Sequence, residues 1–299
     1  MDIGKILDLS IKAAETDKTT ENKFYDLNDH KYFNYIDNEL WKTFVDEMRE
    51  KYPLAYREYG EGAGDELGIK KIGRFPPKMA SYGSSSRMIY LLSRDIENFC
   101  FEKKLPTTVG GIAHMDGYLH SNAVHYYIEA KCREPYSPKS YVIDRKYENL
   151  YRYLDEDTSL DFKCHISIID QDKMKVGFVA NGTELTRFDI KQMISHLLGI
   201  STDKLCNPTN ERTEFRYLLY NPKLIEISND TAKDKILSIY KTEVYECGKI
   251  PFNDLYKVIT TYLFEERNIG TVTPTEMNQI GRNFNFILCD QTSYISNLS

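Results

Sequence analysis

The stretch that most constrains this chain is a short apolar segment that carries two opposite charges. Residues 124–132 are rich in β-branched and aromatic side chains, which predicts a buried strand. Alternate side chains of a strand share a face, so Tyr127, Glu129 and Lys131 should point one way and the residues between them should form an apolar underside. An acid and a lysine on a buried strand are costly unless something pairs with them. We therefore expect a polar site beside this strand.

A second acid lies just upstream. Asp116 falls in the short apolar segment 115–119, and the polar turn 120–122 joins that segment to the strand. Antiparallel pairing of the two segments would bring the carboxylates of Asp116 and Glu129 together at one end of the ladder. Two carboxylates and the Lys131 ammonium form a site for a hard divalent cation and a polarised water.

The order Asp116, then Glu129-Ala130-Lys131, resembles the PD-(D/E)xK nuclease superfamily. Other short sequences follow the order of a bacterial family of proposed restriction endonucleases; they are SSSRM (84–88), FEKKLP (101–106), EPY (134–136), QMISHLLG (192–199) and LLYNP (218–222). The resemblance covers about residues 76–222. Met115 stands where the superfamily motif has proline, a departure that affects only how the chain enters the strand.

The resemblance implies an α/β fold with a restriction-endonuclease-like core, αβββαβ, in which helices flank a mixed central sheet. Helices are added at both ends, so we expect a helical region at 1–75, the nuclease-like core at 76–228 and a helical region at 229–299. The hydrophobic pattern predicts the core helices at 84–93 and 189–198, with Gly199 as the C-cap of the second. It predicts core strands at 99–105 and 215–220, a hairpin at 162–180 and a polar insertion at 134–157. Outside the core, it predicts helices at 2–14, 34–52, 230–246, 252–264 and 274–282.

The resemblance also assigns the site. Asp116, Glu129 and the carbonyl of Ala130 would hold Mg²⁺, or Mn²⁺ in its place. Lys131 would orient or deprotonate a water, or hold the transition-state oxygen. Gln192 resembles the helix glutamine that related nucleases place beside the metal.

The roles of some residues near the site stay open. Glu97 and Glu102 compete as an additional acid. His196 is either a core histidine or a phosphate contact. The other histidines have no metal-ligand spacing such as His-x-x-x-His.

The implied activity is hydrolysis of DNA phosphodiester bonds, in restriction or phage defence, with a homodimer as the form that cuts both strands. Two alternatives stay open: a non-catalytic scaffold that keeps the fold, and an RNA-directed or structure-specific nuclease. A net charge of −6 argues against a nucleic-acid binder, although a local basic groove is enough for phosphate contact. Candidates for such a groove are Lys103, Lys104, Lys131, Arg133, Lys139, Arg145 and Lys146.

The sequence has no basic-then-apolar leader and no apolar run of bilayer length, so we expect a cytoplasmic protein with no membrane partner. Its six cysteines are spread out without a Cys-x-x-Cys pair. Several fall in apolar segments, which favours buried free thiols over disulfides or zinc ligands.

Overall fold

The computed structural model describes residues 38–62, 65–69, 77–80, 84–131, 142–157, 159–160, 162–180, 183–184, 189–219 and 248–289. The helices predicted at 2–14 and 230–246 lie outside these residues, as do Arg133 and Lys139.

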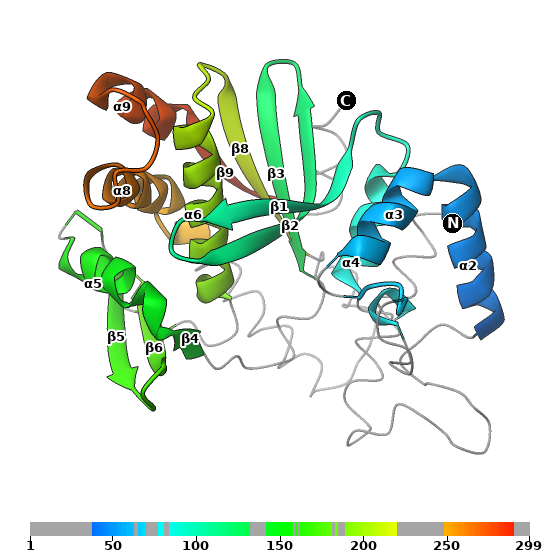
Figure 1. Ribbon diagram of the computed structural model, residues 1–299, viewed down its shortest axis with the longest axis horizontal. Helices are drawn as coiled ribbons and strands as arrows, with labels where there is room; N and C mark the ends of the chain where they lie inside the picture. The colour runs from blue at the N-terminus through cyan, green and yellow to red at the C-terminus, as the bar shows by residue number, and fades with distance from the viewer. Residues whose placement is uncertain are drawn as a thin grey trace, which may run out of the picture.

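The centre of the molecule is a mixed five-stranded sheet (Figure 1). Its strands run in the order β1 (Cys100–Thr107), β2 (Gly111–Ser121), β3 (Val124–Lys131), β8 (Arg212–Leu219) and β9 (Phe284–Cys289). β1, β2 and β3 pair antiparallel, whereas β8 is parallel to β3 and β9 is parallel to β8. The expected α/β architecture, with a mixed central sheet, is confirmed.

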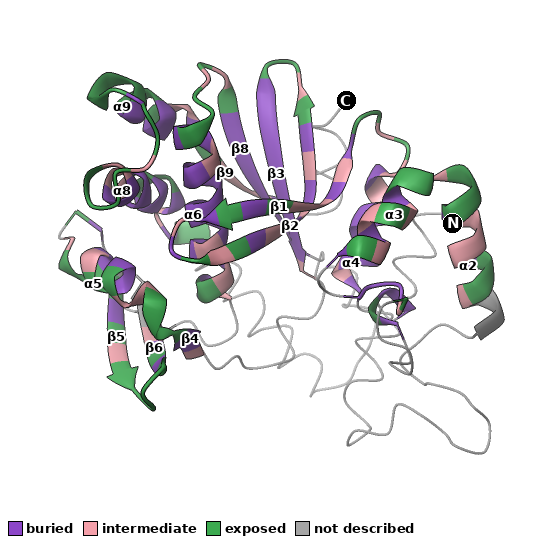
Figure 2. Cartoon of the chain, viewed as in Figure 1, coloured by how far each residue is buried: buried purple, intermediate pink, exposed green. Residues whose placement is uncertain are grey.

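Helices cover both faces of this sheet (Figure 1). On one side lie α2 (Asn38–Lys51), α3 (Pro53–Glu61) and α4 (Ser85–Ser93); on the other lie α6 (Ile190–Cys206), α8 (Phe252–Glu265) and α9 (Pro274–Asn283). Each side has its own apolar cluster, and β3 contributes to both: Tyr127 packs toward α6, while Ile128 and Ala130 pack toward α4. Figure 2 shows that β3 and β8 are buried along most of their length, as the pattern of residues 124–132 predicts.

Side-chain caps set where the two core helices begin. The hydroxyl of Ser84 accepts a hydrogen bond from the N–H of Arg87 at the start of α4. Asp189 does the same for the N–H of Gln192 at the start of α6. Each cap satisfies an N–H that has no partner within its helix. The predicted start of each helix is confirmed.

The predicted end of the second core helix is wrong. α6 does not stop at Gly199 but continues to Cys206. A Cβ at position 199 would lie 2.9 Å from Cβ of Leu105 and 3.1 Å from Cβ of Ala113. The glycine is therefore there because the helix crosses β1 and β2 at close range, and it does not act as a C-cap.

Two parts of the chain are more regular than the sequence pattern suggests. The expected polar insertion contains β4 (Val142–Asp144), a 3₁₀ turn at Arg145–Tyr147 and α5 (Glu148–Glu156), whose apolar side is buried against the α6 cluster. β4 joins the predicted hairpin of β5 (Phe162–Ile168) and β6 (Lys173–Ala180) in a second sheet, with the short β7 (Thr183–Glu184) paired to β6. The expected C-terminal helices α8 and α9 are confirmed, but β9 was not foreseen.

The described cysteines are free thiols in three settings. Cys164 and Cys289 are buried, Cys100 is half-buried and Cys206 is exposed. The expectation of buried thiols thus holds for two of these four.

Gly117 lies where β2 packs closely against the ring of Phe99. A Cβ there would come within 2.4 Å of Cζ of Phe99, whose ring lies in the α4-side cluster. We expect Gly117→Ala to lower the free energy of unfolding by about 1–3 kcal/mol, because the ring must be displaced in a packed core. Urea denaturation measures the change. The matched control is Gly177→Ala on β6, where the new methyl group would sit 3.7 Å from Cβ of His165. An equal loss in the control would contradict the packing explanation.

Candidate carboxylate and lysine site

Three adjacent strands place one acid each in a row. The β2–β3 ladder pairs Gly117 with Ile128, and continuing its register sets Asp116 opposite Glu129. The β1–β2 ladder keeps one register on both sides of Glu102, which sets Glu102 opposite Asp116. The predicted antiparallel pairing of the 115–119 segment with β3 is therefore present, and it brings a third acid with it.

The sheet is distorted at this row. Glu102 has a φ of 53°, a left-handed conformation that costs a non-glycine residue about 1–3 kcal/mol. On β2, both Met115 and Tyr118 pack toward the α6 side, although residues three apart on a regular strand face opposite ways. The regular pleat is thus lost where Glu102 and Asp116 face each other.

Lys131, Gln192 and Glu129 form one hydrogen-bonded group between β3 and α6. The Lys131 ammonium lies 2.5 Å from Oε1 of Glu129 and donates to Oε1 of Gln192 at 2.6 Å. The amide nitrogen of Gln192 donates back to Oε1 of Glu129 at 2.7 Å. The Glu129 side chain is 2% exposed and that of Lys131 is 11% exposed, so the pair sits in a setting where charges interact strongly. The structure thus brings together three of the predicted site residues.

Asp116 is held by the strand opposite. Its Oδ2 accepts a hydrogen bond of 2.7 Å from the backbone N–H of Ala130. Burial, reinforced by the charge of Glu129, raises the pKa of Asp116 well above its usual value, while Lys131 and the Ala130 N–H act against that rise. The backbone of Ala130 thus holds the Asp116 carboxylate, and its neighbours in the strand are Glu129 and Lys131.

Of the two competing acids, Glu102 lies among the buried carboxylates and Glu97 does not. Burial, followed by the charges of Asp116, Glu66 and Glu129, raises the pKa of Glu102 to about 8. Its carboxylate lies against the end of α3, where a Cβ on Gly62 would be 3.1 Å from its Oε2. Glu97 is exposed in the segment that leads into β1.

Glu66 was missed by the sequence reasoning. It is 7% exposed, its backbone carbonyl accepts from the N–H of Met79, and its side chain lies 3.4 Å from the Lys78 ammonium. It falls in a glycine-rich stretch that reads as a loop, and no pattern there separates a site residue from a surface acid. Its charge helps to raise the pKa of Glu102 and of Asp116, so it lies near these two acids.

His196 lies beneath Glu129 and belongs to the core. Its Nδ1 is 3.7 Å from Oε2 of Glu129, one helical turn beyond Gln192 on α6. Burial and the charge of Lys131 lower the pKa of His196 to about 3, so its ring is neutral. Of the two interpretations left open, the structure favours the core histidine.

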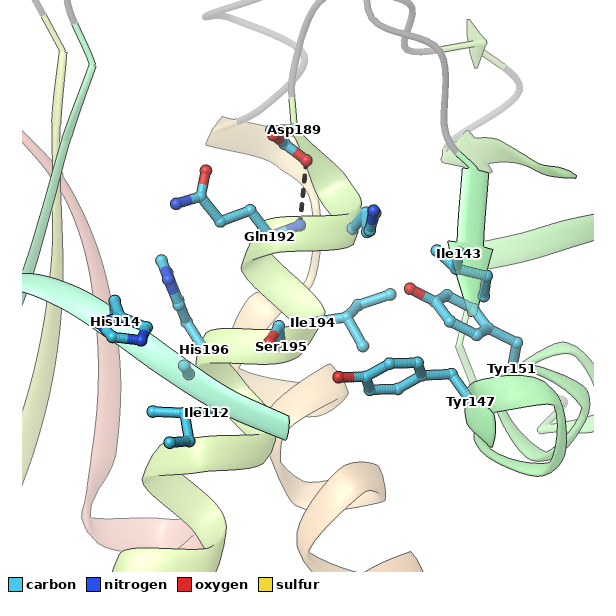
Figure 3. Close-up of a pocket in the computed structure, with 12 residues that line it drawn as sticks. Ile112, His114, Ile143, Tyr147, Tyr151, Asp189, Gln192, Ile194, Ser195 and His196 are labelled. Atoms are coloured by element: carbon cyan, nitrogen blue, oxygen red, sulfur yellow. Dashed lines mark hydrogen bonds between the residues drawn. The ribbon is translucent and has the colours of Figure 1, made fainter. Parts of the chain in front are cut away.

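A cavity of about 360 Å³ borders this group (Figure 3). Gln192 and His196 line one side, and the rings of Tyr147 and Tyr151 line the facing side. Two of the residues that contact Glu129, Gln192 and His196, therefore also form the wall of a space large enough to admit part of a ligand.

The donor set suits a hard divalent cation. Asp116, Glu129, Glu102 and Glu66 all offer carboxylate oxygens, the ligands that Mg²⁺ and Mn²⁺ prefer, but no three of these side chains have oxygens within 4.8 Å of one another, so a bound ion would have to draw them together. Their mutual repulsion, expressed in the raised pKa values of Asp116 and Glu102, would be relieved by a positive ion among them.

The raised pKa of Glu102 predicts a pH-dependent stability. Because its folded pKa of about 8 lies above its ordinary value of 4.5, the stability linked to this group is full below about pH 4.5 and lost as pH rises toward 8. We expect Glu102→Gln to unfold at higher urea concentration than wild type at pH 8, and at a similar concentration at pH 4.5. Denaturation without divalent ions at both values measures this. Glu97→Gln is the control, and a constant difference between wild type and Glu102→Gln across that range would refute the assignment.

In the residues that the structure describes, no helix is both long and apolar enough to cross a bilayer. No family model, curated protein or solved structure matches the chain.

Proposed function

We propose that this protein is a Mg²⁺-dependent nuclease of the PD-(D/E)xK kind that hydrolyses phosphodiester bonds in DNA. The observation that carries the proposal is the convergence of Asp116, Glu129 and Lys131 on two paired strands, with Gln192 of α6 bonded to the last two. The order of the elements α4, β1, β2, β3, α6 and β8 supports it, because it follows the αβββαβ order of the restriction-endonuclease-like core; β4 to β7 and α5 are inserted between β3 and α6 and depart from that core.

Asp116 and Glu129, together with the Ala130 carbonyl, would hold Mg²⁺ or Mn²⁺. When bound, such an ion lowers the pKa of a water and offsets charge that grows on the scissile phosphate. Glu102 supplies a further oxygen and has a pKa of about 8, so it can exchange a proton near neutral pH.

Besides a bound ion, the Lys131 ammonium would supply positive charge at the site. Its ammonium is held between Glu129 and Gln192 by contacts of 2.5 and 2.6 Å, which fixes its position at the edge of the carboxylate cluster. From there it would donate a hydrogen bond to the attacking water or to a phosphate oxygen. Gln192 acts as a positioning residue, because it contacts the lysine and the acid at once.

The charge balance makes the cation essential. The ionised carboxylates of this cluster repel an approaching phosphate, and a divalent ion among them would offset that repulsion. Two of the basic residues proposed for a phosphate-binding groove already contact other groups. The Lys103 ammonium lies over the ring of Tyr118, and the Lys146 ammonium donates to the carbonyl of Gly110. Activity should therefore depend strictly on the metal.

Cleavage of plasmid and single-stranded DNA tests the proposal. We expect wild type to cut DNA with Mg²⁺ or Mn²⁺ and to be inert with EDTA. Asp116→Asn and Lys131→Ala should each lose at least about 10³-fold in rate, since each removes a group placed at the reacting phosphate. Lys163→Ala, a change at an exposed lysine on β5 of the second sheet, should keep full activity.

The same assay separates the alternatives. Cleavage of RNA but not DNA, again lost in both variants, would replace the proposed substrate and keep the site. If wild type leaves DNA and RNA uncut, and Mg²⁺ does not bind, the protein is a scaffold that keeps the fold. The products of plasmid cleavage and the mass of the protein in solution test the homodimer and the restriction role that the resemblance implies.

Gln192 gives a finer test of the hydrogen-bonded group. We expect Gln192→Ala to lower the cleavage rate by about 10–100-fold and to raise the Mg²⁺ concentration needed for half-maximal activity, because both Lys131 and Glu129 lose a partner. Gln192→Glu should be worse than Gln192→Ala, since it puts a further carboxylate beside Glu129. A loss of rate with no change in metal dependence would contradict a role in holding Glu129.

A further inference from the structure

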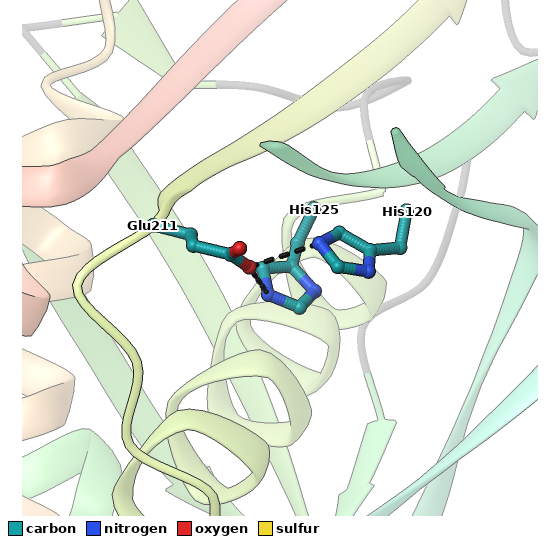
Figure 4. A group of neighbouring side chains, drawn as sticks. All are labelled: His120, His125 and Glu211. Atoms are coloured by element: carbon teal, nitrogen blue, oxygen red, sulfur yellow. Dashed lines mark hydrogen bonds and ion pairs between the residues drawn. The ribbon is translucent and has the colours of Figure 1, made fainter. Parts of the chain in front are cut away.

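Three side chains with metal-ligating groups meet at the far end of the β2–β3 hairpin from the carboxylates. Nε2 of His120 and Nε2 of His125 each lie 2.9 Å from Oε2 of Glu211 (Figure 4). One ligand atom from each residue lies within 4.8 Å of the other two. Two imidazole nitrogens and one carboxylate oxygen are a common ligand set of zinc sites that keep one position open.

The hairpin itself brings the two histidines together. A two-residue turn, Asn122-Ala123, joins the strands, and both residues have positive φ, as a type I′ turn requires. His120 and His125 are direct cross-strand partners, and their rings stack with centroids 4.3 Å apart and planes within 6° of parallel. Stacked in this way, both rings present Nε2 to the same carboxylate (Figure 4).

The third side chain is held in place by backbone contacts. Arg212 N–H donates to the carbonyl of Ala123 in the hairpin turn, so the residue before it, Glu211, is fixed beside the turn. The side-chain amide of Asn283, at the end of α9, donates to the carbonyls of Asn210 and Glu211. Glu211 thus sits at a point where three segments distant in sequence are tied together.

The surroundings of His125 favour metal binding through Nε2. The Tyr118 hydroxyl lies 2.9 Å from Nδ1 of His125 and can donate or accept there, so the ring can take the tautomer that leaves Nε2 without a proton. Nε2 itself is buried and makes no hydrogen bond among the described residues, because its approach to Glu211 is outside hydrogen-bond geometry.

We infer that His120, His125 and Glu211 form a binding site for a late-transition divalent ion of the Zn²⁺ type, separate from the oxygen-only carboxylate site. Ligand atoms of a tetrahedral zinc site lie about 3.3 Å apart, given bonds of about 2.0–2.1 Å. The three side chains reach that arrangement with small adjustments, two of them at partly exposed residues, His120 and Glu211. A bound ion would clamp the hairpin to the segment that enters β8.

Titration of the full chain with Zn²⁺ tests this site. The experiment uses wild type and, to remove the competing carboxylate site, Glu129→Gln. We expect one Zn²⁺ to bind in Glu129→Gln and the same site to fill in wild type, and the affinity of this site to fall at least about ten-fold when His120→Ala or Glu211→Ala is added to Glu129→Gln. His165→Ala, at an exposed histidine on β5, is the matched control and should bind as wild type does.

Two further measurements exclude a purely structural effect of the substitutions. His120→Cys should restore binding, because a thiolate is a zinc ligand, and Co²⁺ should give the visible absorption of a four-coordinate site in wild type but not in His120→Ala. The inference is overturned if wild type binds no Zn²⁺, if His120→Ala and Glu211→Ala bind as tightly as wild type, or if binding disappears in Glu129→Gln. None of these results bears on whether the carboxylate site cleaves DNA.

Discussion

The cost of keeping several acids close together and out of water dominates the centre of this molecule. Asp116 and Glu129 sit on paired strands of the sheet, and burial raises the pKa of Asp116 even though Lys131 is nearby. The protein limits this cost with the N–H of Ala130, the Lys131 ammonium and the amide of Gln192, each aimed at one carboxylate. Buried acids with raised pKa values lower stability at neutral pH, a cost that is more typical of functional sites than of structural cores.

The close approach of these acids also accounts for the distorted backbone of the sheet. Glu102 adopts a positive φ opposite Asp116, and the pleat of β2 is lost there, so that acids on three adjacent strands converge instead of alternating between faces. α6 then has to approach closely enough for Gln192 to reach both Lys131 and Glu129. Gly199 makes this possible further along the helix, where a Cβ would collide with Leu105 and Ala113. The close packing of helix and sheet and the geometry of the site therefore depend on each other.

Local patterns in the sequence predict much of this correctly. The apolar run before Lys131, the Ser84 and Asp189 caps and the turn between β5 and β6 each act over a few residues, so their outcome is visible in the chain. What failed depends on distant contacts. Gly199 has the position of a C-cap in the sequence, and only the close approach of β1 and β2 explains it. Glu66 has the sequence surroundings of a surface acid. β9 forms a strand because it pairs with the edge of β8. The histidine pair was hidden because its spacing of five fits a hairpin register rather than a helix.

Strand β3 connects two groups of ligands of different chemistry. Near its start, His125 meets His120 and Glu211; near its end, Glu129 meets Asp116 and Lys131. Four residues of strand separate His125 from Glu129, or about 13 Å. Nitrogen ligands favour late transition metals, whereas an all-carboxylate cluster favours Mg²⁺ or Mn²⁺. Because the two groups differ in donor type, the ions proposed for them differ as well. An ion at the hairpin end would then stiffen the strand that carries the acid and the lysine without competing for them.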